Sequence, residues 1–558
     1  MKMNFLRKAM KKDQKNQGQV LVILALVLVA LVAIIGLAVD TGYVYVSYAR
    51  LSKAVDAAGL AATGEFKRPG GTSSAQLDAL TDRMVGAAKQ QLYLNGLPKV
   101  PDASGYPIVA VEWCHTNPIA VLCKDSTGTY DVKKVRITVT EMVPTFFLAV
   151  IGFRQIPITV QSYSQAASVD VVVVLDSSES MTYDAADGSA DLDPKTCNPH
   201  GCQPFEKVKS AAKAFADNVL FSPYDRMSVV SFNQYASMAI KMSDDLSAID
   251  TAIDNLLVFQ PLRCPYTRDT LQAFYGTTDI TLIPAPPTAA DPGYTPFFSP
   301  GDPRTLTTCR FLDKDGVSGS FQYMDCPLDY GPSATQDRSH CGSSDPAAGI
   351  ATGGNILQGI YTNVTSLDPS LDPDNAATWP EKRDQSLWVM VFLGDGSANS
   401  AYACSDAACS GAISICPRNT WPDSWGNPYC QDKNADESTR HEEFLSAGVR
   451  NPAYDADDAA RDAFDAVTND GAIIFTVGLS STVHPLKNGL TVVPSYPAGL
   501  TLAPGTTLMG YPFANKISGD ISTTKLPNAG EYKFAADGSS LTPIFLAIAN
   551  KIATRLIQ

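Results

Sequence analysis

One segment of this chain restricts the fold more than any other, because a fully apolar strand ends there in polar side chains. Residues 171–175 are Val, Val, Val, Val and Leu, so the run is unbroken and almost wholly β-branched. A strand of this kind lies at the centre of a parallel sheet, where helices cover both faces. We therefore expect an α/β fold built on a doubly wound, mostly parallel sheet.

Three oxygen donors follow this strand directly. Asp176, Ser178 and Ser180 alternate along the chain, which places their side chains on one side of a turn. Ligands bind at the carboxyl edge of an open α/β sheet, because the loops diverge there and leave a crevice. A donor set made only of oxygen suits a hard cation such as Mg²⁺, with Mn²⁺ or Ca²⁺ as alternatives. The pattern predicts one half of a metal site.

The spacing Asp-x-Ser-x-Ser resembles the metal-ion-dependent adhesion site (MIDAS) of von Willebrand factor type A (VWFA) domains, whose fold is a doubly wound sheet. A second apolar strand, residues 387–393, leads to Asp395 in a Gly-Asp-Gly turn where the family has Thr-Asp-Gly. Residues 351–359 resemble the family's third loop, in which a Thr after two glycines opens a helix. That position holds Asn355, which we favour as the donor, and Thr352 is the alternative. The resemblance implies a metal site formed by Asp176, Ser178, Ser180, Asp395 and either Asn355 or Thr352.

Each of these three segments also has a purely structural explanation. Serines after a strand cap the next helix, and Asp-Gly is a common turn. The segments nevertheless occur in the chain order of the family, and two of them follow strongly apolar strands. Their combination favours the metal site.

The rest of residues 168–558 alternates between helical and strand patterns, as a parallel sheet requires. We expect helices at 205–220, 243–257, 356–362, 459–467 and 541–556, and strands at 227–232, 472–477 and 532–534. The segment is much longer than the roughly 200 residues usual for such a domain. We assign the excess to insertions rich in Pro, Gly, Asp and Cys, at about 182–204, 260–346, 397–444 and 480–528.

The amino terminus indicates a membrane anchor. Six Lys or Arg residues and one Asp precede an apolar stretch from Val20 to Val39, whose length matches the ~30 Å hydrocarbon core of a bilayer. No Ala-x-Ala-like cleavage site follows it, so we prefer a retained span to the alternative, a removed signal sequence. Because basic residues stay in the cytoplasm, we expect a cytoplasmic tail at 1–18 and a transmembrane helix at 19–40.

The region after the span resembles a second family. A Val-Asp pair at 39–40 is followed by an Asp-Ala-Ala-rich segment at 54–62, and residues 135–166 combine an alternating strand with the run Val-Pro-Thr-Phe-Phe. This ordered set resembles the tight-adherence (Flp) pilus assembly proteins of the TadE and TadG type. Gly18-Gln19 is similar to the Gly-Glu processing point of pilin-like precursors, and whether it is cut stays open. With a carboxyl-terminal A domain, the resemblance is to TadG-like proteins, and residues 41–167 form the family's helix and β region.

This resemblance and the anchor place the chain in the cell envelope. We expect a single-pass protein of the cell (inner) membrane, with its bulk periplasmic or extracellular. The net charge is −14, and the basic tail contributes +5 to it, which leaves −19 on the exported part. A part this acidic, without a basic stripe, repels phosphate groups, which argues against nucleic acid as a partner.

All twelve cysteines lie between Cys114 and Cys430, on the outward side of the predicted span. An even count confined to that side favours disulfides in an oxidising compartment. Short spacings suggest that Cys114 pairs with Cys123 and Cys197 with Cys202. A zinc cluster that includes His200 is the disfavoured alternative for the second pair. The pairing stays open in two groups of four, Cys264, Cys309, Cys326 and Cys341, and Cys404, Cys409, Cys416 and Cys430.

We expect this protein to bind rather than to catalyse. In the resembled A domains, a carboxylate of a protein ligand completes the coordination shell of the cation. A desolvated cation at a sheet edge attracts such an anion strongly, because the local dielectric is low. The alternative is a structural scaffold of the pilus machinery that docks onto envelope components. A metal-dependent hydrolase is disfavoured, because the five histidines lack paired-ligand spacing and no nucleophile elbow occurs.

Overall fold

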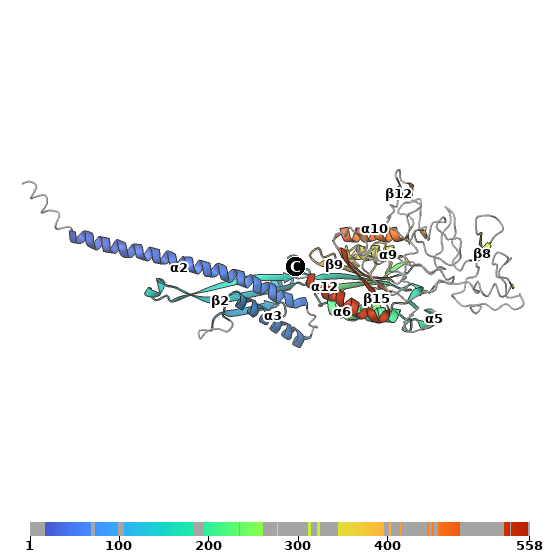
Figure 1. Ribbon diagram of the computed structural model, residues 1–558, viewed down its shortest axis with the longest axis horizontal. Helices are drawn as coiled ribbons and strands as arrows, with labels where there is room; N and C mark the ends of the chain where they lie inside the picture. The colour runs from blue at the N-terminus through green and yellow to red at the C-terminus, as the bar shows by residue number, and fades with distance from the viewer. Residues whose placement is uncertain are drawn as a thin grey trace, which may run out of the picture. The chain divides into compact units, whose positions relative to one another are not determined.

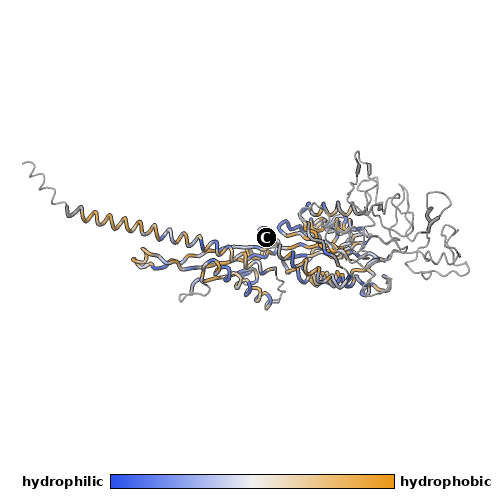
Figure 2. Tube along the Cα trace, viewed as in Figure 1, coloured by the Kyte–Doolittle hydropathy of each residue, from blue (hydrophilic) through white to orange (hydrophobic). Residues whose placement is uncertain are grey.

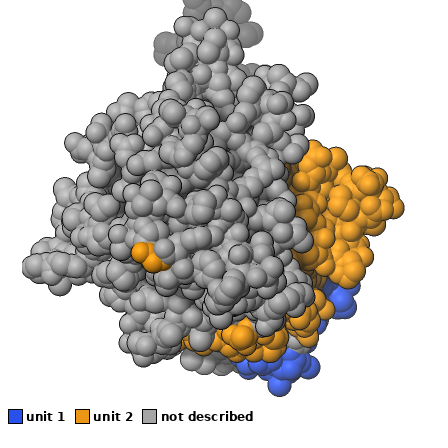
Figure 3. All heavy atoms as spheres, turned by 90° about the vertical axis from the view of Figure 1, so that its right-hand side faces the viewer, with its two compact units in different colours: residues 1–167, 557 blue, residues 168–556, 558 orange. Residues whose placement is uncertain are grey.

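The computed structural model describes residues 17–67, 73–98, 105–182, 194–233, 235–260, 276, 311–313, 321–323, 344–394, 401–402, 413–414, 444–445, 449–450, 456–479, 529–535 and 537–555. The chain divides into two compact units, which Figure 3 distinguishes by colour. Unit 1 runs from Met1 to Ala167 and unit 2 from Ser168 to Leu556.

Helix α2 (Gln17–Thr63) is the longest element of unit 1, and its two halves have different surroundings. From Leu21 to Val39 every side chain is exposed, with Gly36 alone buried among these residues. Figure 2 shows this half as a continuous apolar stretch. From Leu51 onward, buried residues such as Ala54 and Ala58 pack against the sheet of unit 1. Within the described residues, α2 is the one helix that is long and apolar enough to cross a membrane.

The sheet of unit 1 is antiparallel, with the order β1-β2-β3. Its strands are β1 (Ile108–Trp113), β2 (Lys133–Pro144) and β3 (Gln155–Ala166). Strand β2 alternates between buried and half-buried positions, as a strand with one covered face does. Helix α3 (Ser74–Leu94) is tied to the sheet where the indole of Trp113 donates to the Thr81 hydroxyl at 2.9 Å. The described part of the unit also contains the short helical turns η1 (Gly64–Lys67), α4 (Ala120–Cys123) and η2 (Leu148–Ile151).

Unit 2 is built on a six-stranded sheet with the order β15-β14-β9-β4-β5-β6, in which only the edge strand β6 is antiparallel. The strands are β4 (Val169–Asp176), β5 (Arg226–Phe232), β6 (Ala236–Ser243), β9 (Leu387–Gly394), β14 (Ile473–Leu479) and β15 (Ala529–Ala535). All eight residues of β4 are buried. This sheet confirms the predicted doubly wound, mostly parallel α/β fold.

Two hydrophobic cores explain why β4 needs an unbroken apolar sequence. Val171, Val173 and Leu175 pack in one core with helices α6 (Phe205–Val219), α7 (Leu246–Asp254) and α12 (Leu541–Arg555). Val172 and Val174 pack in the other core with α9 (Pro346–Leu357) and α10 (Ala456–Asn469). Successive side chains of a strand point to opposite faces, so a strand between two helical layers is apolar at every position. Figure 1 shows the helices on both sides of the sheet.

Most of the predicted elements of unit 2 form, but one predicted helix is wrong, one strand is missed and one helix begins later than predicted. The helix predicted at 356–362 is wrong, because α9 begins ten residues earlier, at Pro346. The edge strand β6 was not predicted, and the helix that follows it, α7, begins at Leu246 rather than at residue 243.

The predicted insertions lie mostly outside the described residues. Of the first, the structure describes the short helix α5 (Pro194–Cys197). Elsewhere it describes three pairs of short strands: β7 (Phe311–Asp313) with β8 (Phe321–Tyr323), β10 (Ala401–Tyr402) with β11 (Ile413–Ser414), and β12 (Phe444–Leu445) with β13 (Val449–Arg450).

Candidate metal-binding site

The predicted donors that follow β4 lie together at the carboxyl edge of the sheet. Asp176 pairs with Phe232 of β5 across the sheet and is 1% exposed. Its Oδ1 accepts a hydrogen bond from the backbone N–H of Ser178 at 2.8 Å, which turns the chain back over the strand end. The hydroxyls of Ser178 and Ser180 are 2.8 Å apart. One carboxylate and two hydroxyls therefore occupy a single turn, as the sequence predicts.

Ser177, between these donors, fixes the turn to its neighbours. Its backbone N–H and its hydroxyl both donate to the carbonyl of Phe232, at 2.7 and 3.0 Å. Its carbonyl accepts from the backbone N–H of Phe259 at 2.7 Å. Since Ser177 is held on both sides, its hydroxyl is directed to the β5 backbone rather than to the Ser178 and Ser180 hydroxyls.

A second segment, which no sequence pattern above pointed to, reaches the same carboxylate. The Ser344 hydroxyl donates to Asp176 Oδ2 at 3.3 Å. The next residue, Asp345, caps α9 by accepting from the backbone N–H of Ala348 at 3.0 Å, and its own N–H donates to the Asn233 carbonyl at 2.7 Å. Asp345 followed by Pro346 is a helix-start signal, an N-cap and a Pro at the first position, that could have located this segment.

Thr352 and Asn355, the predicted third-loop donors, lie inside α9 rather than before it. The helix descends along β4, because Gly349 lies against Val174 and Gly353 against Val172. At 1.5 Å per residue, Asn355 is about 15 Å along the helix from its cap, and Thr352 about 10 Å. The structure therefore does not bring either residue to Asp176; the residue of this segment that contacts Asp176 is Ser344.

The two glycines that suggested a loop have a packing role instead. A Cβ on Gly353 would lie 2.7 Å from Met390 Cε, and a Cβ on Gly354 would collide with Val467 of α10. Helix α9 therefore needs glycine to approach the sheet and α10 so closely. In this chain, the Gly-Gly pair that resembles the family's third loop allows α9 to pack closely on the sheet and on α10.

The end of β9 also reaches the site. Asp395 itself lies outside the described residues. Its neighbour Gly394 is the last residue of β9, and a Cβ built on Gly394 would lie 3.9 Å from Asp176 Oδ2. The same Cβ would lie 3.2 Å from the Phe392 ring, so glycine suits this crowded strand end where the resembled family has threonine.

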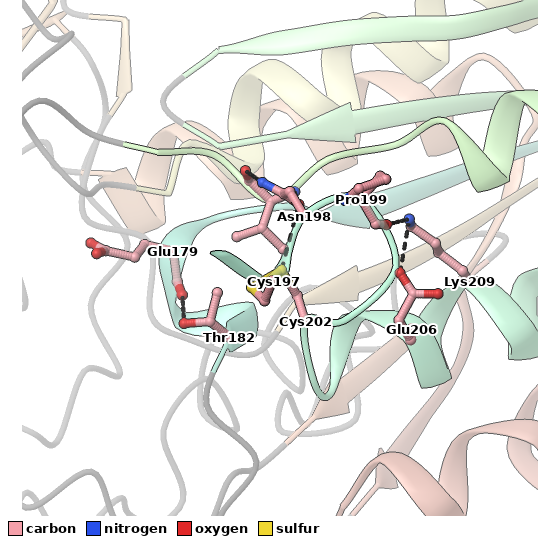
Figure 4. The surroundings of a disulfide bond; sticks show 9 residues. Glu179, Thr182, Cys197, Asn198, Pro199, Cys202, Glu206 and Lys209 are labelled. Atoms are coloured by element: carbon pink, nitrogen blue, oxygen red, sulfur yellow. Dashed lines mark hydrogen bonds and ion pairs between the residues drawn. A yellow bond between two sulfur atoms is a disulfide. The ribbon is translucent and has the colours of Figure 1, made fainter. Parts of the chain in front are cut away.

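The disulfide loop that precedes α6 lies next to the segment of Glu179 and Thr182, which includes the candidate donor Ser180 (Figure 4). Cys197 and Cys202 are bonded, and between them the Asn198 side chain pairs with both backbone groups of Val258. Asn198 Nδ2 donates to the Val258 carbonyl at 2.9 Å, and the Val258 N–H donates to Asn198 Oδ1 at 3.0 Å. The following residue, Phe259, holds the Ser177 carbonyl, so the loop is two contacts away from the donors.

The comparisons with known proteins divide the chain in the same way as its fold. Residues 18–68 match the family model described as putative Flp pilus-assembly TadE/G-like, and residues 171–276 match the model of the von Willebrand factor type A domain. The chain carries a TadE/G-like segment and a von Willebrand factor type A domain. No curated protein matches it.

Several solved structures are similar to this chain at low identity. The pilus adhesin SpaC from Lactobacillus rhamnosus GG is 12% identical with a TM-score of 0.29, over 76% of this chain and 33% of SpaC. The hypothetical protein BatB from Bacteroides thetaiotaomicron is 11% identical with a TM-score of 0.27, over 69% of this chain and all of BatB. The proximal thread matrix protein 1 of the mussel byssus, with a zinc-occupied MIDAS motif, is 11% identical with a TM-score of 0.25, over 70% of this chain and 46% of that protein. The chain thus spans about a third of SpaC and about half of the byssus protein.

The donors of the A domain fit a hard divalent cation. The Asp176 carboxylate and the hydroxyls of Ser178, Ser180 and Ser344 are all oxygen donors, as Mg²⁺ requires. Within the described part of the chain, His, Cys, Asp and Glu side chains form no group of three that could hold a metal. Cys197 and Cys202 are consumed by their disulfide, so the zinc alternative for that pair is wrong.

Both predicted short-range disulfides are formed, since Cys114 is bonded to Cys123 in the same manner. The remaining eight cysteines lie outside the described residues.

Proposed function

We propose that the A domain binds Mg²⁺ through Asp176, Ser178, Ser180 and Ser344, together with Asp395. The observation that supports this most directly is the contact between Ser344 and Asp176. These residues are 168 positions apart in the chain, yet the hydroxyl of one lies 3.3 Å from the buried carboxylate of the other. Two segments thus bring oxygen donors to one point at the edge where α/β sheets bind ligands.

We further propose that the bound cation captures a carboxylate of a protein partner. Three of the four donors in the described part of the site are uncharged hydroxyls, and with Asp395 the proposed site has two carboxylates. An incoming carboxylate would be attracted to the cation because the local dielectric at the sheet edge is low. A bound cation would supply the attraction, and the oxygen donors of Asp176, Ser178, Ser180 and Ser344 would hold it at the strand end.

The role that we propose is adhesion or docking in the cell envelope, not catalysis. The exposed apolar half of α2 supports its assignment as a single-pass anchor, with the amino end cytoplasmic and both units exported. The TadE/G-like segment supports a place in a pilus assembly. The protein partner is then another pilus or envelope component, or a surface that the pilus contacts.

Calorimetric titration of the full-length chain in nanodiscs with Mg²⁺ alone tests the metal site. We expect one ion per chain, complete loss of binding in Asp176→Ala, and affinity at least about tenfold weaker in Ser344→Ala, which corresponds to about 1.4 kcal/mol. Ser210→Ala is the matched control, because that hydroxyl bonds to the Glu206 carbonyl within α6, and it should bind Mg²⁺ like the parent. Equal Mg²⁺ binding by the parent and a folded Asp176→Ala variant would disprove the site.

A further inference from the structure

The connection between β2 and β3 carries an exposed apolar surface. We call residues 145–154 the β2–β3 tip. No charged residue occurs between Glu141 and Arg154. Within the tip, Val150 is 86% exposed, Ile151 69% and Phe153 63%. Exposed apolar residues scattered singly are ordinary, but a contiguous group of this kind marks a contact surface.

The tip is fixed to α2 at the end of the apolar half of that helix. Asp40 of α2 is 1% exposed and accepts hydrogen bonds from three successive backbone N–H groups of the tip. The donors are Phe146, Phe147 and Leu148, at 2.8, 2.9 and 2.7 Å. An aspartate that satisfies three N–H groups at once holds the tip against the helix.

Aromatic contacts before and after Asp40 in the sequence of α2 show which part of the helix the tip lies against. The Phe146 ring packs edge-on against Tyr43, with the ring centroids 5.3 Å apart. The Phe147 ring covers Gly36 so closely that a Cβ there would lie 2.6 Å from it. Gly36 precedes Asp40 by one helical turn, about 6 Å, on the side of the apolar stretch. The tip therefore overlaps the outer end of the predicted span.

We propose that the β2–β3 tip is buried in the outer leaflet of the membrane that α2 spans, with acyl chains packed around Val150, Ile151 and Phe153. This inference rests on the proposed anchoring of α2. The exposed side chains of the tip continue the exposed apolar surface of Leu21–Val39, which a bilayer covers and no described segment does. The chain would then be held in the membrane by a helix and a hairpin.

Two features of the tip fit a lipid environment. Non-helical backbone at this depth is tolerated only where its polar groups are satisfied, and Asp40 satisfies three N–H groups while itself shielded. Charged and aromatic residues lie where the membrane would meet water. The tip ends at the exposed Arg154, whose charge suits lipid phosphates. Tyr45 and Tyr48, which are exposed, follow Asp40 on α2. The Arg50–Glu141 ion pair, about 15 Å beyond Asp40 along α2, lies in water.

Tryptophan quenching by brominated lipids tests this proposal in the full-length chain reconstituted into phosphatidylcholine and phosphatidylglycerol vesicles. The reporter is Val150→Trp, at an exposed position where the new ring displaces nothing. Val29→Trp in the apolar half of α2 reports whether the helix is inserted. Leu367→Trp, which replaces an apolar residue of unit 2 that is 62% exposed, is the matched control. Emission of the parent protein, with its five tryptophans, is subtracted.

We expect lipids brominated near the headgroup to quench Val150→Trp, lipids brominated deep in the chain to quench Val29→Trp, and neither to quench Leu367→Trp. Quenching of Val29→Trp without quenching of Val150→Trp overturns the insertion of the tip and leaves the anchor intact. That result would also be obtained if the tip were a docking surface for protein. If neither position is quenched, the anchor proposed above is wrong and the inference fails with it.

Discussion

Strand β4 carries a buried aspartate near each end, and their partners differ. Asp176, at the carboxyl end, accepts from Ser178 and Ser344. Asp170, near the amino end, is 1% exposed and forms ion pairs with Arg226 and Arg383. Burial alone would raise the pKa of Asp170, but the hydrogen bonds and charges of the two arginines outweigh it and lower that pKa. One strand thus has a structural carboxylate at one edge and the candidate ligand at the other.

Replacing Asp170 should therefore destabilise unit 2. We expect Asp170→Asn to lower the free energy of unfolding by about 3–5 kcal/mol, because it leaves buried guanidinium charge without its partner. Urea unfolding of the full chain, followed by circular dichroism, measures this. The matched control is Asp384→Asn, since Asp384 pairs with Lys382 but is 81% exposed, and its loss should cost less than about 1 kcal/mol.

The same carboxylate gives a direction for pH dependence. Because the pKa of Asp170 is lower in the folded state than the ordinary value of about 3.9, its stabilisation is complete above that value. The stabilisation is lost as the pH falls through the folded-state pKa. The difference in unfolding free energy between the parent and Asp170→Asn should shrink in acid, and a difference that grows on acidification would contradict this assignment.

Among the elements, the disulfide loop is linked to the metal-site turn by identifiable contacts. The Asn198 side chain holds Val258, and the Phe259 N–H holds the Ser177 carbonyl. On the far side of the loop, the buried Lys209 ammonium donates to the Pro199 carbonyl at 2.9 Å. The loop is thus fixed to α6 at one side and to the turn of donors at the other.

Opening this loop should weaken metal binding from a distance. With Cys197 and Cys202 both changed to Ser, we expect the unfolding free energy to fall by about 2 kcal/mol and Mg²⁺ affinity to fall several-fold. Calorimetry on the folded variant measures the second effect. The matched control changes Cys114 and Cys123 to Ser, which opens a disulfide of unit 1 and should leave Mg²⁺ affinity unchanged. If both double variants changed the Mg²⁺ affinity equally, the Asn198 contacts would not be what links the disulfide loop to the site.

Helix α9 and strand β6 show where sequence reasoning ends. The β4 and β9 strands and the turn of Asp176, Ser178 and Ser180 are predictable, because each pattern is local and continuous. The start of α9 could not be predicted from the sequence. Its two glycines suggest a loop, but in the structure they allow close packing against Met390 and Val467, which are remote in sequence. Strand β6 is half-buried and antiparallel at an edge, so its apolar signal is weak. The contact of Ser344 with Asp176 is tertiary, and only the helix-cap signal points to it.

At the scale of the whole molecule, we propose a unit 1 held in the membrane and a unit 2 whose A domain binds a metal ion. The chain beyond residue 18 carries a charge of −19, which disfavours anionic partners in general. A site that presents a divalent cation is then a local exception, where a carboxylate is attracted rather than repelled. A protein ligand would then bind only where one of its carboxylates contacts the cation, because the rest of the acidic surface repels it.

The most direct test of the central claim is anomalous diffraction from crystals of the protein soaked with Mn²⁺, which has the oxygen preference of Mg²⁺ and a usable anomalous signal. We predict one strong peak about 2.0–2.3 Å from oxygens of Ser178 and Ser180, beside Asp176 and Ser344. Asp395 should lie in the same coordination shell. A well-ordered carboxyl edge of β4 without a peak, or a peak at another place only, would contradict the account.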